Sequence, residues 1–124
     1  MAKIVYLILG GAAGTIARYF LASSIYGWWG INFPYGTFIV NCAGCFIIGV
    51  LSGISDKRLL LGPEMRTLLM VGFCGAFTTF STFILETNNL FKDGEVFKAF
   101  LNVLLSVVAG FVIFRIGLLL GEII

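Results

Sequence analysis

The chain has 124 residues, of which 60% are hydrophobic and 11% charged, and its mean hydropathy is +1.07. This composition excludes an ordinary water-soluble domain, in which about 25% of residues are charged, and it requires lipid as the solvent. The net charge of +2 is too small and too scattered for a nucleic-acid-binding surface or a polybasic lipid-binding tail. With no histidine and only three cysteines, all in apolar segments, the sequence offers no zinc or redox site.

Four apolar stretches follow one another along the chain. A helix needs roughly 20 mainly apolar residues to cross about 30 Å of hydrocarbon. The predicted helices cover residues 4–26, 35–54, 66–90 and 96–120. Turn-forming segments separate them at 32–34, 55–63 and 92–94. The first stretch is too long for a signal-peptide core and predicts a retained span, so the sequence predicts one all-α transmembrane domain, 1–124.

The charges between the spans specify orientation poorly. An even number of spans places both termini and the second connection on one side. The basic residues on that side are Lys3, Lys57, Arg58 and Arg66, and those on the other side are Lys92 and Lys98. This count slightly favours a single orientation with both termini inside. The alternative is a chain that inserts both ways and pairs as an antiparallel dimer.

The first span carries a glycine pair and an arginine. Gly10 and Gly14 are four residues apart, as are two later glycine pairs, and this spacing allows close helix approach. Four helices of this length enclose no water-filled route, so function requires an oligomer. Arg18 lies one turn after Gly14, and we expect it to attract anions into a vestibule. Arg115, in the fourth span, is expected instead to snorkel to the headgroups.

The second span contains a single amide, Asn41. An unpartnered amide in lipid is costly, so its side chain must face protein or a cavity. Interhelical hydrogen bonding and a pore role remain equally open on this evidence. The neighbouring Cys42 and Cys45 are interpreted as small helix residues.

The third span holds the segment GFCGAFTTFSTF at residues 72–83. Glycines and clustered threonines are poor helix formers, so the sequence predicts a helix broken near the middle of the membrane. Irregular backbone at that depth survives only where protein or a water-lined cavity covers it, and its freed carbonyls can hold a cation. The alternative is a continuous helix whose hydroxyls bond back one turn.

Aromatic rings recur within this segment at Phe77, Phe80 and Phe83, a spacing that would place them on one side of a helix. The positive edge of such a ring can attract a small anion without binding it as tightly as a lysine would. Hydroxyls of Ser81 and Thr82 could donate hydrogen bonds to the same ion. The plainer interpretation of the stripe is packing against lipid or core.

Three further residues complete the polar set. Glu86 is expected to close the third span, where it would pair with an arginine or meet water. In the fourth span Asn102 and Ser106 share a helix face, where they either extend a polar track or pair with another helix.

The sequence resembles the small bacterial fluoride channels of the Fluc type, also called CrcB proteins, over essentially its whole length. Three ordered motifs carry the resemblance: GGAAGTIARY at 10–19, GTFIVNCAG at 36–44, and the third-span segment at 72–83. The resemblance implies an antiparallel dual-topology homodimer in the bacterial inner membrane, with two pores that passively export fluoride from the cytoplasm.

The resemblance also implies roles for individual residues. Its fluoride pore would be lined by Asn41, Phe80, Phe83, Ser81, Thr82 and Ser106. Backbone oxygens of Gly75 and Thr78 from both subunits would hold a central structural sodium ion, and Arg18 and Glu86 would lie at a vestibule. Gly110 and Phe114 stand where family members often carry a hydroxyl, so the polar track on the fourth span is expected to be shorter or completed elsewhere.

Two other function classes compete with a fluoride channel. A small multidrug exporter also has four helices, but it needs a carboxylate in the middle of a membrane helix, usually the first, and the first span here has none. A nonconducting assembly subunit is disfavoured by the polar cluster from Thr78 to Thr82. The sequence offers no nucleophile paired with a general base and no set of metal ligands that would support an enzyme.

Overall fold

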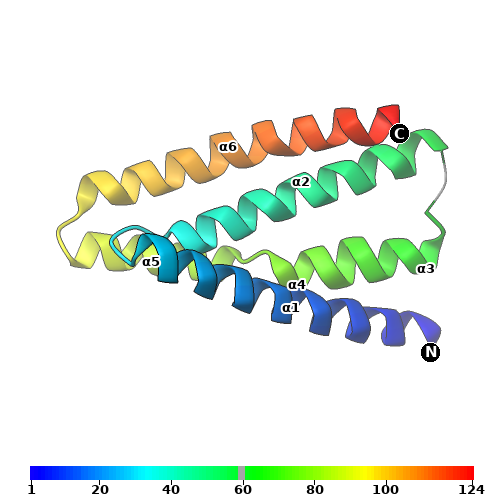
Figure 1. Cartoon of the computed structure of the whole chain (residues 1–124), viewed down its shortest axis with the longest axis horizontal. Helices are drawn as coiled ribbons and strands as arrows, with labels where there is room; N and C mark the ends of the chain where they lie inside the picture. Colours follow the sequence, from blue (N-terminus) through cyan, green and yellow to red (C-terminus); the bar gives the residue numbers. More distant parts are fainter. Residues whose placement is uncertain (59–60) are drawn as a thin grey trace.

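The computed structural model describes the backbone of residues 1–58 and 61–124 and the side chains of 1–56 and 61–124. Within these ranges the chain is helical and contains no strand. Its elements in chain order are α1 (Ala2–Trp29), α2 (Tyr35–Arg58), α3 (Pro63–Arg66), the π-helix η1 (Thr67–Cys74), α4 (Gly75–Phe77), α5 (Phe80–Lys92) and α6 (Val96–Ile123). The elements from α3 to α5 follow one another along one rod, which is the third span (Figure 1).

Four helical stretches are long and apolar enough to cross a membrane. They contain 22 to 30 residues each, with mean hydropathies from 1.6 to 2.6. Most of their large apolar side chains point outward; Phe97, Phe100 and Phe111 on α6 are examples. Lipid is the solvent that makes such a surface stable, so the prediction of an all-α protein with four transmembrane helices is confirmed.

Helix ends differ from the predicted limits by a few residues. The largest difference is at α2, which continues through Ser55 and Asp56 to Arg58, where the sequence predicted a turn. A helix that extends into the headgroup layer can carry polar residues in its last turns, because that layer adds about 10–15 Å to the apolar thickness. The rest of the predicted connection at 55–63 includes residues 59–60, which lie outside the described residues, as do the side chains of Lys57 and Arg58.

Glycines with positive φ lie in the connections that follow α1 and α5. Gly30 follows α1 with φ 78°, and its N–H donates to the carbonyl oxygen of Tyr26 at 2.9 Å. Gly94 also has φ 78° and joins α5 to α6. Left-handed backbone of this kind favours glycine, which lacks the Cβ that would clash.

The four spans are arranged as two parallel pairs (Figure 1). α2 lies along α6, and α1 lies along η1 and α4. Glycines form both contacts: a Cβ at Gly49 would collide with the carbonyl oxygen of Phe114, and a Cβ at Gly14 with that of Phe73. Backbone approach of this closeness is typical of membrane helices with small residues four apart. Both termini lie at the end of the bundle where α2 is followed by α3, as the even number of spans predicts.

Candidate functional site

The third span is broken at Thr78 and Thr79. Thr78 has φ −83° and ψ 159°, and Thr79 has φ −149° and ψ 114°, so both are extended between α4 and α5. Asn41 of α2 binds this break twice: its Oδ1 accepts from the Thr79 N–H at 2.8 Å, and its Nδ2 donates to the Thr79 carbonyl at 3.1 Å. The break is confirmed, and the continuous helix is excluded.

A hydroxyl cluster restarts the helix after the break. The side chain of Thr79 is the N-cap of α5, and its Oγ1 accepts from the Thr82 N–H at 3.2 Å. The same hydroxyl donates to Thr82 Oγ1 at 3.0 Å and lies 3.5 Å from Ser81 Oγ. Capping of this kind supplies a partner to an N–H that has none within the helix. The positive end of the α5 dipole therefore lies inside the third span.

The break also diverts the usual helical donors of two carbonyl groups. In a continuous helix the carbonyl of Gly75 would accept from the Thr79 N–H, and that of Thr78 from the Thr82 N–H. Here the first N–H donates to Asn41 and the second to the Thr79 hydroxyl. The diverted donors belong to the two carbonyls that the resemblance assigns to sodium.

An open groove of about 320 Å³ runs beside the break. It is lined by Asn41, Gly44, Cys45, Ile48, Met70, Cys74, Gly75, Thr78, Thr79 and Phe80. The Phe80 ring is 75% exposed, whereas Phe83 is 8% exposed, and the two ring centroids are 5.7 Å apart at an interplanar angle of 43°. Ser81 and Gly75 are exposed on the same segment.

The predicted stripe of three phenylalanines does not form. Phe77 ends α4 and stacks on Phe73, with ring centroids 5.4 Å apart, while Phe80 and Phe83 belong to α5. The sequence spacing implied one helix face, but the extended residues at 78 and 79 rotate the chain between Phe77 and Phe80. Only the second and third rings remain together.

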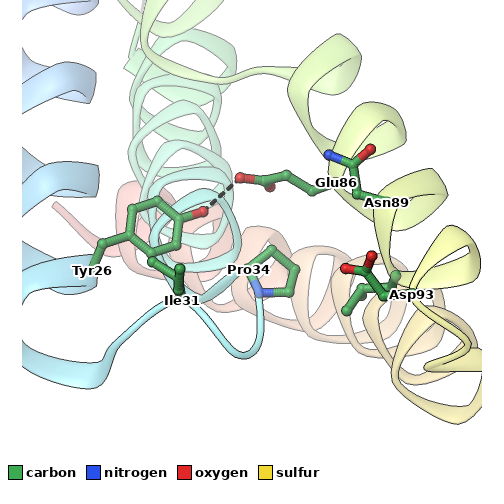
Figure 2. A pocket seen from close by; sticks show the side chains of 7 residues that line it. Tyr26, Ile31, Pro34, Glu86, Asn89 and Asp93 are labelled. Carbon is green, nitrogen blue, oxygen red and sulfur yellow. Dashed lines mark hydrogen bonds between the residues drawn. The ribbon is translucent and has the colours of Figure 1, made fainter.

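Arg18 and Glu86, predicted as vestibule residues, line one cavity of about 260 Å³ between α1, α2 and α5. Glu86 does not close the third span, because α5 continues to Lys92. Its hydrogen-bond partner is Tyr26 of α1, whose hydroxyl donates to Oε1 at 2.6 Å (Figure 2). The Tyr26 hydroxyl also lies 3.3 Å from the hydroxyl of Thr37.

The family model described as CrcB-like protein, Camphor Resistance (CrcB), matches residues 5–118. The chain belongs to this family. A relative from Maridesulfovibrio salexigens is 43% identical over 124 residues, which cover 100% of this chain and 98% of the relative. One from Magnetococcus marinus is 44% identical over 122 residues, which cover 98% and 99%. Both are named fluoride-specific ion channel FluC.

A third relative is longer than this chain. The protein from Methylococcus capsulatus, also named fluoride-specific ion channel FluC, is 52% identical over 102 residues. The match covers 82% of this chain and 45% of that protein, so the matched region is less than half of the relative's length.

On α6, the two polar residues predicted to share a face have different surroundings. Asn102 is 2% exposed, and its Nδ2 donates to Thr87 Oγ1 of α5 at 2.9 Å. It therefore pairs with another helix, which is one of the two alternatives that the sequence left open. Ser106 is half-buried, and its Oγ lies 3.5 Å from Asn102 Oδ1.

At Gly110, where family members often carry a hydroxyl, a side chain of α2 lies beside the glycine. A Cβ at Gly110 would lie 3.5 Å from Cys45 Sγ, so the cysteine thiol fills the space beside this glycine. Phe114 contacts Gly49 through its backbone, and Arg115 is exposed.

Sequence reasoning missed three residues of this site: Tyr26, Thr37 and Cys45. Tyr26 donates a hydrogen bond to Glu86, and the Thr37 hydroxyl lies within hydrogen-bond distance of Tyr26. Cys45 lines the groove that Asn41 also lines. The first motif ends before Tyr26, and periodicity could not reveal a contact between side chains 60 positions apart. Among the described residues no group of three His, Cys, Asp or Glu side chains could hold a metal ion.

Proposed function

We propose that the chain forms a fluoride-selective channel that passively exports fluoride from the cytoplasm through the cell membrane. Family membership and the printed names of the relatives support fluoride as the ion. The observation that carries the proposal is the broken third span clamped by Asn41, with the hydroxyls of Thr79 and Thr82 beside it. A channel of this kind performs no covalent chemistry, and the exporter alternative has no support from the family.

The pore residues would stabilise fluoride without a full positive charge. Phe80 and Phe83 would present ring edges, which carry partial positive charge. Ser81, Thr82, Asn41 and Ser106 would supply hydrogen-bond donors as the hydration shell is removed. Sites built from partial charges bind weakly enough for the ion to leave, which conduction requires.

A second copy would complete the pore. Phe80 and Gly75 are exposed on one protomer, and the groove beside the break is open. Irregular backbone in lipid needs a protein or water cover, and an antiparallel homodimer would supply it. Cross-linking of single cysteines placed along α5 tests this arrangement. Antiparallel products are expected, and exclusively parallel products would overturn dual topology.

A structural sodium ion would fit the break at the dimer interface. Gly75 and Thr78 would hold it through backbone carbonyls, whose helical donors are diverted to Asn41 and Thr79. Carbonyl oxygens are suitable ligands for a hard cation. The negative ends of these carbonyl dipoles would attract the ion, and the ion would stabilise the paired breaks. Replacing sodium with N-methylglucamine in purified protein should lower the melting temperature, and an unchanged melting temperature would contradict the site.

The function is tested with purified protein in liposomes loaded with fluoride or chloride. Addition of a potassium ionophore should release fluoride rapidly and chloride not at all. Phe80→Ile should reduce fluoride release, and Phe97→Ile is the matched control because Phe97 on α6 is 77% exposed, close to the 75% of Phe80. If lipid exposure alone mattered, the two variants would behave alike. Absence of fluoride release from folded wild-type protein would overturn the channel.

A further inference from the structure

Two cavities share a wall made by Tyr26 and Glu86, at the end of the bundle where α1 is followed by α2 and α5 by α6. The outer cavity, of about 400 Å³, is lined by Tyr26, Ile31, Pro34, Glu86, Asn89, Leu90 and Asp93 (Figure 2). The inner cavity is the one of about 260 Å³ that contains Arg18. Tyr26 and Glu86 are the two residues that line both cavities. Thr79, at the break, lines the inner cavity and the groove beside Phe80.

The wall is held by one short hydrogen bond. The Tyr26 hydroxyl donates to Glu86 Oε1 at 2.6 Å, a length typical of a hydroxyl bound to a carboxylate. Thr37 supports the phenol from α2, with its hydroxyl 3.3 Å from Tyr26 Oη and its N–H donating to the same oxygen at 3.4 Å. The second oxygen of Glu86 is buried and has no hydrogen-bond partner among the described residues. The carboxylate position therefore depends mainly on the phenol.

We infer that Tyr26 is a positioning residue that latches Glu86 across the passage between the outer and inner cavities, so that fluoride passes only when this hydrogen bond opens. The inference rests on the proposed fluoride channel and adds a control point at one mouth of it. The cavities then form a series, from the outer cavity past the latch to Arg18, and past Thr79 to the groove at Phe80.

Electrostatics explains why the latch would limit an anion. Glu86 is half-buried, and a partly buried carboxylate repels fluoride more strongly than one in water, because screening is weaker there. Arg18, which lines the inner cavity, attracts the ion on that side of the latch. When the bond opens, Glu86 can turn towards the outer cavity, where the Asn89 amide stands on the same helix (Figure 2).

Tyr26→Phe removes the latch and keeps the ring. We expect the fluoride current of the reconstituted full-length protein in planar bilayers to rise about tenfold, which corresponds to about 1.4 kcal/mol. A purely structural role of the phenol would instead lower the folded fraction and the current. Tyr35→Phe is the matched control, with the same chemical change at the same end of the bundle, on a ring that packs against Trp29 and Phe33. Its current should equal that of the wild type.

Glu86→Gln gives a second, independent route to the same answer. The amide oxygen can still accept from Tyr26, but without the charge the hydrogen bond is weaker and opens more often, so the current should also rise. If the two side chains act through one bond, the double variant should conduct less than the product of the single effects predicts. Multiplicative effects, or an unchanged or lower current in folded Tyr26→Phe protein, would overturn the latch. If the wild-type protein conducts no fluoride, the channel itself is overturned. If it does conduct, the variants test the latch alone.

Discussion

The two parallel helix pairs of this protein begin with the same contact and end differently. In the α2–α6 pair, glycines on both helices keep the backbones close over several turns: Gly49 and Gly53 against α6, and Gly117 and Gly121 against α2. In the other pair, Gly10 and Gly14 of α1 make such contacts with η1, but the partner rod stops being helical at Thr78.

The difference suggests that the α2–α6 pair supports the structure, whereas the second pair carries the polar groups of the candidate site. The α2–α6 pair is regular, and its backbones stay close at the glycines. The second pair places a π-helix, a short α-helix and two extended residues in one span, and its polar groups lie beside the break. The regular pair also supplies the clamp, because Asn41 extends from α2 to Thr79. A rigid helix pair thus holds the irregular one at a fixed geometry.

The largest predicted effect breaks the regular pair. Gly117→Ala would drive a methyl group into the carbonyl oxygen of Phe46, and we expect a loss of about 3 kcal/mol. Gly110→Ala is the matched control on the same helix, since its methyl group would meet Cys45 Sγ at an ordinary 3.5 Å. Thermal unfolding of both variants in detergent measures the difference. Equal stabilities would mean that the close glycine contact does not hold the pair.

The next effect disconnects the two pairs. Asn41→Ala leaves both the N–H and the carbonyl of Thr79 without their side-chain partner, which should cost about 2–3 kcal/mol. We expect fluoride efflux to fall at least as strongly, because the break loses its geometry. Asn88→Ala, the same change at an exposed position, is the control. Normal efflux from Asn41→Ala protein would show that the clamp is dispensable.

A smaller effect concerns the restart of the broken span. Thr79→Val removes the hydroxyl that caps α5 and should lower stability by about 1 kcal/mol. Thr78→Val is the comparison, because the Thr78 hydroxyl donates only to the carbonyl of Cys74 one turn back, at 2.9 Å. Chemical denaturation of the two variants ranks them. The capping argument fails if Thr78→Val is the more damaging change.

The smallest effect tests the polar link between α5 and α6. Asn102→Val removes the bond to Thr87 Oγ1, and a hydrogen bond between membrane helices contributes on average about 0.6 kcal/mol. We expect a loss of this order with fluoride efflux retained, because Asn102 serves packing rather than the pore. A strong loss of efflux in a stable protein would instead place Asn102 on the conduction path.

Much of the fold could be predicted because hydropathy and backbone propensity are local. Four apolar stretches of sufficient length determined the spans, and clustered threonines beside glycines determined where the third one breaks. The same local reasoning failed at Phe77, since a periodic stripe assumes an uninterrupted helix. It also ended α2 too early at Ser55, because a polar residue does not stop a helix that has reached the headgroup layer.

By itself, the sequence determined the membrane environment, the four helices, the position of the break and the family motifs. The tertiary structure alone decided which groups meet. Asn41 and Thr79 are 38 positions apart, and Tyr26 and Glu86 are 60 apart. Such contacts depend on the rotation and register of helices, which the glycine contacts between backbones set. Hydropathy adds up along one helix, but a hydrogen bond between two helices exists only when their packing brings donor and acceptor within about 3 Å.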